Sequence, residues 1–173
     1  MTMNYRLTLP FLPLLLVACA SGMSGPRAVA ELQPTKGNTT SGSVSFVQNA
    51  GLVRVSGEIR GIKPNAEHGF HVHEKGDCSS GDGMSAGGHF NPDGKPHGSH
   101  AAMTHHAGDI PSLKADANGV ARFSFESSTL SVGSGMSDIT GKGLIVHRDP
   151  DDYVTQPTGN SGPRLACAVI TRS

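Results

Sequence analysis

The sequence predicts an all-β domain: an antiparallel sandwich or flattened barrel of eight short strands, with two long loops that carry the functional groups. Glycine and proline contribute 23 and 11 of the 173 residues, which indicates many turns. Apolar and polar residues alternate in several short runs, as in half-buried strands. The sequence shows no sustained helical periodicity and no internal repeat. Its length suits one domain with its own hydrophobic core.

The N-terminus carries the features of an export signal. In residues 1–18 the only charge is Arg6, and the apolar run that follows it is too short and too interrupted by proline for a membrane-spanning helix. The run ends in Leu-Val-Ala-Cys, which resembles a bacterial lipoprotein signal with Cys19 as the acylated first residue. Ordinary cleavage, with Cys19 free or discarded, is the alternative.

Residues 19–28 then form the lipidated cysteine and a flexible tether, because this stretch is rich in small and helix-breaking residues. The domain occupies residues 29–173. This organisation predicts a periplasmic protein that is anchored to membrane lipid through Cys19. Ala20, in place of an aspartate, favours the outer membrane.

The expected strands follow one another with turn residues between them. Asn49 to Gly51 forms a turn between two strand-like runs, which indicates a hairpin. The expected strands cover residues 29–31, 44–47, 52–59, 67–73, 119–126, 138–147 and 164–170. Residues 74–109 and 148–163 form the two long loops, and loops on a rigid scaffold are where binding groups are expected.

The spacing of the histidines points to metal binding. His71 and His73 are two residues apart on an expected strand, so their rings point to the same face. Further candidates follow in the loops: His89, His97, His106, Asp109 and His147. Nitrogen donors with one carboxylate suit tetrahedral zinc, whereas an all-imidazole cluster with an open position suits copper. A lone histidine is usually only solvated, but the joint pattern predicts two metal sites.

The charge balance and the cysteines narrow the class further. Lys and Arg together number 14, as do Asp and Glu, so the chain lacks the basic excess that would indicate a nucleic-acid partner.

The cysteines predict a crosslink. If Cys19 is lipidated, Cys78 and Cys167 remain as the only pair in an oxidising compartment, which predicts a disulfide between them. Two unpaired buried thiols are the alternative, and export disfavours them.

Five motifs give the chain a family resemblance. They are Gly-Phe-His-Val-His at 69–73, Gly-His-Phe-Asn-Pro at 88–92, His-Ala-Gly-Asp at 106–109, Ile-Val-His at 145–147 and Gly-Pro-Arg-Leu-Ala-Cys-Ala-Val-Ile at 162–170. Over the whole mature domain, the chain resembles the copper/zinc superoxide dismutases, particularly the exported bacterial lipoprotein type. The resemblance implies a Greek-key form of the eight-stranded sandwich.

The resemblance also implies a metal ligand set. The copper ligands would be His71, His73, His89 and His147. The zinc ligands would be His89, His97, His106 and Asp109, with His89 as an imidazolate that bridges both metals.

Two further residues take a role from the resemblance. Asp151 would accept hydrogen bonds from one histidine of each site, although the neighbouring Asp149 and Asp152 are alternatives. Arg164 would bind and guide an anionic substrate beside the copper. Three histidines fall outside the pattern, namely His68, His100 and His105. His105 competes with its neighbour for the ligand role, and the spacing to Asp109 favours His106.

The implied activity is the dismutation of superoxide, which would protect the cell envelope from extracytoplasmic superoxide. One superoxide gives up an electron and leaves as dioxygen. A second takes up that electron with two protons and leaves as hydrogen peroxide, and His89 and Arg164 would be the catalytic residues. A non-catalytic copper/zinc-binding lipoprotein of the same fold, acting as a metal chaperone or buffer, is the alternative. Pairing into a homodimer is left open.

Overall fold

The computed structural model describes residues 1–3 and 25–173, so most of the predicted signal, Cys19 and most of the tether lie outside the described residues. The described chain is almost entirely strand and loop. Its elements are β1 (Arg27–Pro34), β2 (Ser41–Asn49), β3 (Leu52–Arg60), β4 (Glu67–His68), β5 (Phe70–His73), a 3₁₀ turn η1 (Met84–Ala86), β6 (Leu113–Lys114), β7 (Val120–Ser127), β8 (Gly143–His147), β9 (Arg164–Val169) and β10 (Thr171–Arg172). No helix in this part of the chain has the length and apolar character needed to cross a membrane.

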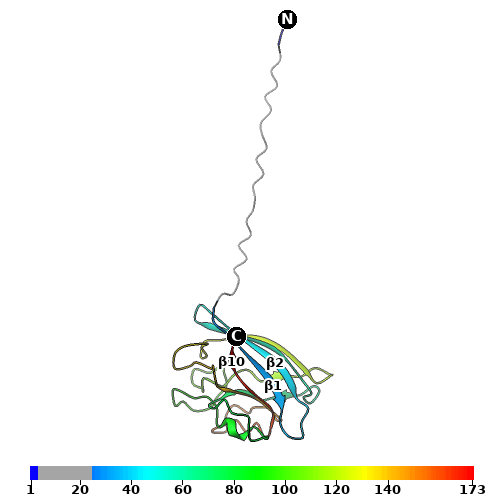
Figure 1. Ribbon diagram of the computed structural model, residues 1–173, viewed down its shortest axis with the longest axis vertical. Coiled ribbons are helices and arrows are strands. Elements are labelled where there is room, and N and C mark those ends of the chain that lie inside the picture. The colour runs from blue at the N-terminus through cyan, green and yellow to red at the C-terminus, as the bar shows by residue number, and fades with distance from the viewer. Residues whose placement is uncertain (4–24) are drawn as a thin grey trace.

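The strands form one large curled sheet, which confirms the predicted all-β class (Figure 1). Eight strands belong to it, in the order β5-β8-β9-β1-β2-β3-β7 with β10 beside β1, and all of these neighbours are antiparallel. The edge strands are β5 and β7, and the chain crosses from one side of the sheet to the other between β3 and β5, and again between β7 and β8. The short strands β4 and β6 pair separately.

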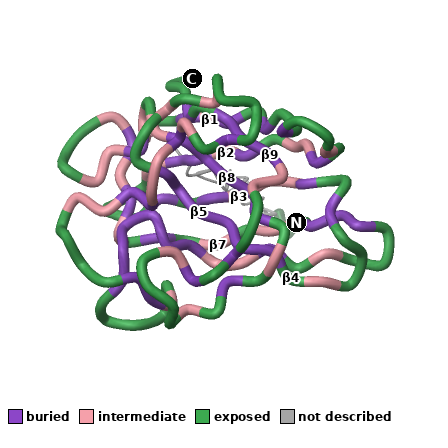
Figure 2. The backbone as a smooth tube through the Cα atoms, turned by 90° about the horizontal axis from the view of Figure 1, so that it is seen from below, coloured by how far each residue is buried: buried purple, intermediate pink, exposed green. Residues whose placement is uncertain are grey.

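The core lies inside the curl of the sheet, where Figure 2 shows the buried backbone surrounded by exposed loops. In β1 the period-2 pattern is visible, because Ala28, Ala30 and Leu32 are buried while the residues between them are not. Phe70 of β5 packs edge-on against Phe123 of β7, with ring centroids 5.4 Å apart. This contact joins the two edges of the large sheet through side chains, so the sheet closes into a flattened half-barrel.

Two predicted strand boundaries are wrong. The expected strand 138–147 begins only at Gly143, because the Asp138 carboxylate accepts the N–H groups of Gly133 and Thr140, both at 2.9 Å, and so caps a loop. The expected strand 67–73 breaks at Gly69, where a Cβ would lie 2.5 Å from the Ser161 hydroxyl. The break lets β4 pair with β6 while β5 pairs with β8.

The first strand also begins earlier than expected. β1 starts at Arg27, so the predicted boundary between tether and domain at residues 28 and 29 falls inside a strand. Arg27 and Ala28 pair there with Val47 and Phe46 of β2.

Candidate metal centre

Two buried clusters of ligand-type side chains share one residue. The first holds His71, His73, His89 and His147, and the second holds His89, His97, His106 and Asp109. In each cluster the possible ligand atoms lie within 4.8 Å of one another, and every member is buried. The fold therefore gathers all seven residues that the sequence singled out, and His89 belongs to both groups. We name them the four-histidine cluster and the aspartate cluster.

The strands place the four-histidine cluster. His71 and His73 alternate along β5 with Phe70 and Val72, which belong to the hydrophobic core. His147 ends β8, where the ladder with β9 shifts register between Val146 and His147. Such a bulge re-aims the side chain that follows it, which brings this ring to the other two.

Backbone hydrogen bonds tie the long loop to β5. The Val72 N–H donates to the Gly108 carbonyl at 3.0 Å, and the Phe90 N–H donates to the Val72 carbonyl at 2.8 Å. These bonds hold the residues next to His89 and Asp109 directly against the strand that carries His71 and His73. The loop is long in sequence but fixed where the ligands stand.

In the aspartate cluster one carboxylate oxygen is the centre. Oδ1 of Asp109 lies 2.8 Å from Nδ1 of His89, 3.0 Å from Nδ1 of His97 and 3.3 Å from Nδ1 of His106. Oδ2 accepts the backbone N–H groups of Gly98, at 3.1 Å, and His106, at 2.9 Å. The three Nδ1 atoms and Oδ1 thus converge on one point, as the four donors of a tetrahedral zinc site do.

Hydrogen bonds fix which nitrogen each ring presents to the four-histidine cluster. Nδ1–H of His73 donates to the Gly87 carbonyl at 3.0 Å, and Nδ1–H of His147 donates to the Gly162 carbonyl at 3.1 Å. A carbonyl only accepts, so each ring presents Nε2 to the cluster, and these two Nε2 atoms are 3.4 Å apart. Nε2 of His71 bonds Asp151, which leaves Nδ1 of His71 for the cluster.

Unsatisfied ring nitrogens show that both clusters fit a metal. Among the described residues, Nδ1 of His71, Nε2 of His89 and Nδ1 of His106 are buried without a hydrogen-bond partner. Buried polar atoms normally have partners, and a cluster of unpartnered nitrogens is what removal of a metal leaves. Burial lowers the pKa of His71 to about 4 and holds the pKa of His73 and of His147 well below the usual value, so these rings are neutral, which is their ligating form.

Asp151 connects the two clusters by hydrogen bonds to one histidine of each. Its Oδ2 lies 2.7 Å from Nε2 of His71 and its Oδ1 lies 2.9 Å from Nε2 of His97. Burial alone would raise the pKa of Asp151, but the hydrogen bonds from His71 and His97 outweigh it, so the pKa lies below its ordinary value. The neighbouring carboxylates are engaged elsewhere, since Asp149 pairs with Arg148 and Asp152 caps its own turn at Thr155.

Arg164 lies at the start of β9, opposite His147 in the ladder. Its guanidinium donates to the carbonyls of Gly83 and Gly87, both at 2.6 Å. The Gly87 carbonyl also accepts Nδ1–H of His73, so one peptide group links the arginine to a ring of the four-histidine cluster. Burial lowers the pKa of Arg164, and the negative charge of Asp82 opposes that shift, so the guanidinium stays positively charged.

Cys78 and Cys167 form the predicted disulfide, with Cα atoms 5.9 Å apart. Cys167 pairs with Ile145 of β8 within the sheet, so the bond fastens the loop before His89 to a central strand. Arg164 is three residues away on the same strand. The crosslink therefore holds the arginine and the loop that it contacts in one place.

Three histidines lie outside the clusters, as expected. His68 is buried, and its Nδ1–H donates to the His147 carbonyl at 2.9 Å, so it supports a cluster residue through the backbone. Nδ1–H of His105 donates to the His106 carbonyl at 2.7 Å, so the spacing argument that favoured His106 agrees with the geometry. His100 lies on the surface of the same loop.

Two residues that support His97 and Asp151 were not predicted from the sequence. Gln156 accepts the His97 N–H at 2.8 Å and donates to the His97 carbonyl at 2.9 Å, which clamps that backbone. Gly159 has φ +65°, and a Cβ there would overlap Oδ1 of Asp151. Both lie in the 148–163 loop, and only the glycine left a signal, as one of several turn residues.

Comparison with known proteins shows the family. The copper/zinc superoxide dismutase (SODC) family model matches residues 40–170. The Superoxide dismutase [Cu-Zn] of Paramecium bursaria Chlorella virus 1 is 43% identical over 75% of this chain and 71% of that protein. Superoxide dismutase [Cu-Zn] 2 of Aquifex aeolicus is 37% identical over 90% and 93%, and the Saccharomyces cerevisiae Superoxide dismutase [Cu-Zn] is 42% identical over 83% and 96%.

A solved structure agrees with the sequence relatives. The crystal structure of the clock protein EA4 superposes with a TM-score of 0.77 and 40% identity, over 87% of this chain and 97% of that chain. The chain belongs to the copper/zinc superoxide dismutase family, a family of enzymes that use copper and zinc.

Proposed function

We propose that this chain dismutes superoxide at the four-histidine cluster, with copper held by His71, His73, His89 and His147 and zinc held by His89, His97, His106 and Asp109. The observation that carries the proposal is the position of His89. Its Nδ1 points to Asp109 at 2.8 Å, while its Nε2 is buried and has no partner among the described residues. One imidazole thus offers a nitrogen to each cluster.

In this proposal copper serves the electron transfer and the protein serves the proton transfer. Copper, when bound, would supply the redox couple through which an electron passes from one superoxide to the next, and zinc has no redox chemistry of its own. Nε2 of His89 is placed to hold a proton and release it to the departing peroxide, since it is the ring nitrogen that faces the four-histidine cluster. Asp109 fixes that ring from the other side.

Arg164 and Asp151 hold the site in shape. The guanidinium of Arg164 is tied to two carbonyls, so it offers a fixed positive charge and N–H groups to an anion beside the cluster. Asp151 accepts one N–H from each cluster and keeps both rings turned inward.

The proposal extends to the cell envelope. Cys19 would carry the lipid, the residues between it and β1 would serve as the tether, and the domain would act in the periplasm, on the outer membrane. One feature of the fold suits this arrangement. The described chain reaches β1 at Arg27, whereas the site lies at the other end of β1, where Pro34 pairs with Ala166 of β9.

The separation between tether and site follows from strand length. β1 has eight residues, which span about 25 Å at roughly 3.3 Å per residue. Figure 1 shows η1, which contacts the Arg164 region, at the end remote from the C-terminus and from the start of β1. An anchor at Cys19 would leave the substrate mouth facing away from the lipid, open to diffusing superoxide.

The test is superoxide decay with residues 25–173 loaded with copper and zinc. Rapid turnover is expected, with loss in His147→Ala and in a copper-free sample. Arg164→Ala should reduce the rate constant by about tenfold or more, whereas Arg148→Ala, an exposed arginine paired with Asp149, should not. Tight copper binding without turnover would contradict the proposal and favour the metal chaperone or buffer.

Cell-level tests are separate. Incorporation of labelled fatty acid should be lost in Cys19→Ser, with release of the protein from the membrane fraction. Unchanged fractionation would refute the anchor without touching the dismutase activity. Sedimentation equilibrium of the loaded domain decides between the monomer and the homodimer.

A further inference from the structure

The turn between β1 and β2 presents an exposed lysine. The Thr35 carbonyl accepts the Asn38 N–H at 3.0 Å, and Gly37 has φ +83°. A positive φ at the third of four residues is typical of a type II β-turn, and glycine adopts it without strain. Lys36 is the second residue of this turn and is exposed. Among the described residues, its side chain has no ion-pair or hydrogen-bond partner, so its positive charge is not neutralised locally.

Hydrogen bonds fix this turn to the loop and the strand around the proposed guiding arginine. The Lys36 N–H donates to the Gly81 carbonyl at 2.7 Å, and the Thr35 hydroxyl donates to the Arg164 carbonyl at 2.7 Å. The guanidinium of Arg164 donates to the Gly83 carbonyl at 2.6 Å, two residues along the chain from Gly81. The turn, the loop and the start of β9 thus form one closed set of contacts, which holds the backbone of Lys36 in place relative to Arg164.

Lys36 and Arg164 line one hollow of about 290 Å³. Asp82 is the single carboxylate among its lining residues, so two cationic groups face one anionic group. Arg164 also connects the hollow to the four-histidine cluster, because its guanidinium shares the Gly87 carbonyl with the ring of His73. The hollow therefore lies between an exposed lysine and the arginine beside the cluster.

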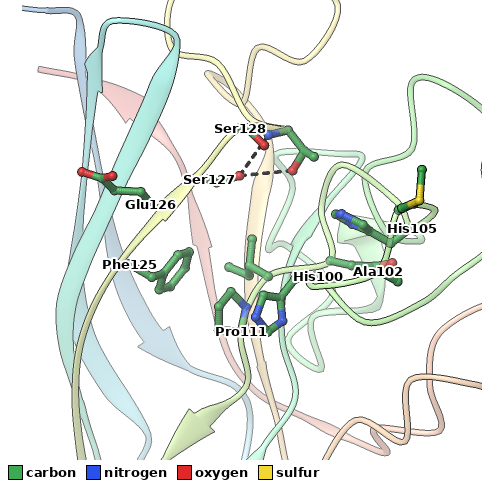
Figure 3. A pocket seen from close by; sticks show the side chains of 12 residues that line it. His100, Ala102, His105, Pro111, Phe125, Glu126, Ser127 and Ser128 are labelled. Carbon is green, nitrogen blue, oxygen red and sulfur yellow. Dashed lines mark hydrogen bonds between the residues drawn. The ribbon is translucent and has the colours of Figure 1, made fainter.

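Two other surfaces near the clusters lack an excess of positive charge. The hollow beside the aspartate cluster, of about 310 Å³, is lined by Asp109 and Glu126 and by no lysine or arginine (Figure 3). The 148–163 loop contains no lysine, and its only arginine pairs with the adjacent aspartate at 2.9 Å. The whole chain has no net charge, with 14 basic and 14 acidic residues. A field that attracts an anion must therefore be local, and the hollow at the β1–β2 turn has the charges for it.

We propose that Lys36 is the outer guide of the substrate: its charge draws superoxide into the hollow, where Arg164 receives the anion beside the four-histidine cluster. The inference rests on the proposed dismutation at that cluster. Lys36 does not touch the reacting groups, so it acts on the rate of encounter and not on the electron or proton transfer. Its effect must fade as salt is added, because the Debye length shortens from about 30 Å at 0.01 M to about 3 Å at 1 M.

The first experiment measures the rate constant of superoxide decay against ionic strength, with the full chain loaded with copper and zinc. Lys36→Gln should lower the rate constant about two- to threefold at about 10 mM salt and leave it unchanged at about 1 M. Lys36→Arg, which keeps the charge, should restore the salt dependence of the parent. Lys114→Gln is the matched control, because it also removes one positive charge, from an exposed lysine that pairs with Glu67 between β6 and β4. It should leave the rate constant unchanged at both salt concentrations.

A salt dependence in Lys36→Gln equal to that of the parent would overturn the proposal. An equal loss in Lys114→Gln would assign the effect to net charge and would overturn it as well.

The second experiment separates this role from the proposed dismutation, since copper binds in the metal chaperone or buffer too. Azide, a small anion that binds copper, is titrated onto the copper-loaded chain and followed by the change in copper absorption. Lys36→Gln should weaken azide binding about two- to threefold at low salt only. This result without superoxide turnover would refute the dismutase and keep the guiding charge. Unchanged azide affinity at low salt would overturn the role of Lys36 even in an active enzyme.

Discussion

Nε2 of His71 donates a 2.7 Å hydrogen bond to Oδ2 of Asp151, and this bond decides which nitrogen of the ring reaches the four-histidine cluster. The two residues are 80 positions apart in the chain. The other oxygen of the same carboxylate receives His97, at 2.9 Å. A single side chain therefore orients one ring in each cluster, and its contribution can be measured on both metals.

Asp151→Asn should weaken the binding of both copper and zinc by about 10–100-fold. An amide has one acceptor oxygen, so one of the two imidazole N–H groups loses its partner. Chelator competition on the purified domain measures both affinities. Asp152→Asn is the matched control, because that carboxylate caps only its own turn at Val154 and Thr155. Equal effects of the two variants would contradict the role given to Asp151.

Gly159→Ala should reduce zinc affinity and stability more than another left-handed glycine does. A Cβ at residue 159 would overlap Oδ1 of Asp151 and lie 2.5 Å from Nε2 of His97. Gly94→Ala is the control, since Gly94 has nearly the same φ, +64° against +65°, with no atom within 4 Å of its Cβ position. Both variants bear the backbone strain of about 1–3 kcal/mol, and only the first should lose zinc. Urea unfolding and zinc competition separate the two effects.

The metal-free domain should lose stability as the pH rises from about 6.5 to 9. Burial alone would lower the pKa of His97, but hydrogen bonds to Asp109 and Asp151 outweigh it and raise the pKa to about 9. A raised pKa in the folded state gives stability that is complete below the unfolded value of 6.5 and lost through 9. Chemical unfolding of metal-free protein across this range measures the slope, which His97→Gln should flatten.

The two carboxylates that bond His97 make the metal-free domain less stable as the pH falls. The pKa of Asp109 and that of Asp151 lie below the ordinary value, because hydrogen bonds from histidines outweigh their burial. Their contribution is present above the unfolded pKa and is lost as the pH falls through the folded one. Metal-free protein should therefore be most stable in mildly acidic to neutral solution. A stability maximum above pH 9 would contradict both assignments.

Removal of the disulfide by Cys78→Ala with Cys167→Ala should cost about 4–5 kcal/mol of unfolding free energy on the loop-entropy model. The bond closes a separation of 89 residues, which is why the expected effect is large. Urea unfolding of the metal-free double variant, against the oxidised parent, measures it. A loss below about 1 kcal/mol would mean that the unfolded chain already holds the loop before His89 in a restricted arrangement.

Asp82→Asn should raise the rate of superoxide capture at low salt, by about twofold, and the gain should vanish at high salt. Asp82 and Arg164 line the same hollow, and the carboxylate opposes the guanidinium charge that would attract an anion. The asparagine can keep the bond from the Met84 N–H, so the loop should hold its shape. Asp116→Asn changes net charge equally, at a turn that pairs with Arg122, and should have no effect. An equal gain in both variants would point to net charge alone.

The sequence carried the strand pattern and the residue types of the site. Alternation marked most strands, and the two-residue spacing of His71 and His73 placed both rings on one face, because strand geometry repeats every two residues. The export signal and the cysteine count predicted the Cys78–Cys167 bond. These are local or compositional properties, and they do not depend on how the chain closes on itself.

The tertiary structure alone decided which atoms meet. The family resemblance pointed to Asp151 but left Asp149 and Asp152 open, and only the structure shows that Asp151 alone of the three reaches two histidines, which lie 80 and 54 positions away in the chain. The break at Gly69 follows from contact with Ser161, and the support of His97 comes from Gln156 and Gly159 across the site. The choice between Nδ1 and Nε2 in each ring depends on the acceptor behind it, and such acceptors are set by packing between distant segments. The sequence determines which side chains can bind a metal. The orientation of each ring is fixed only when hydrogen bonds form between segments that are distant in the chain.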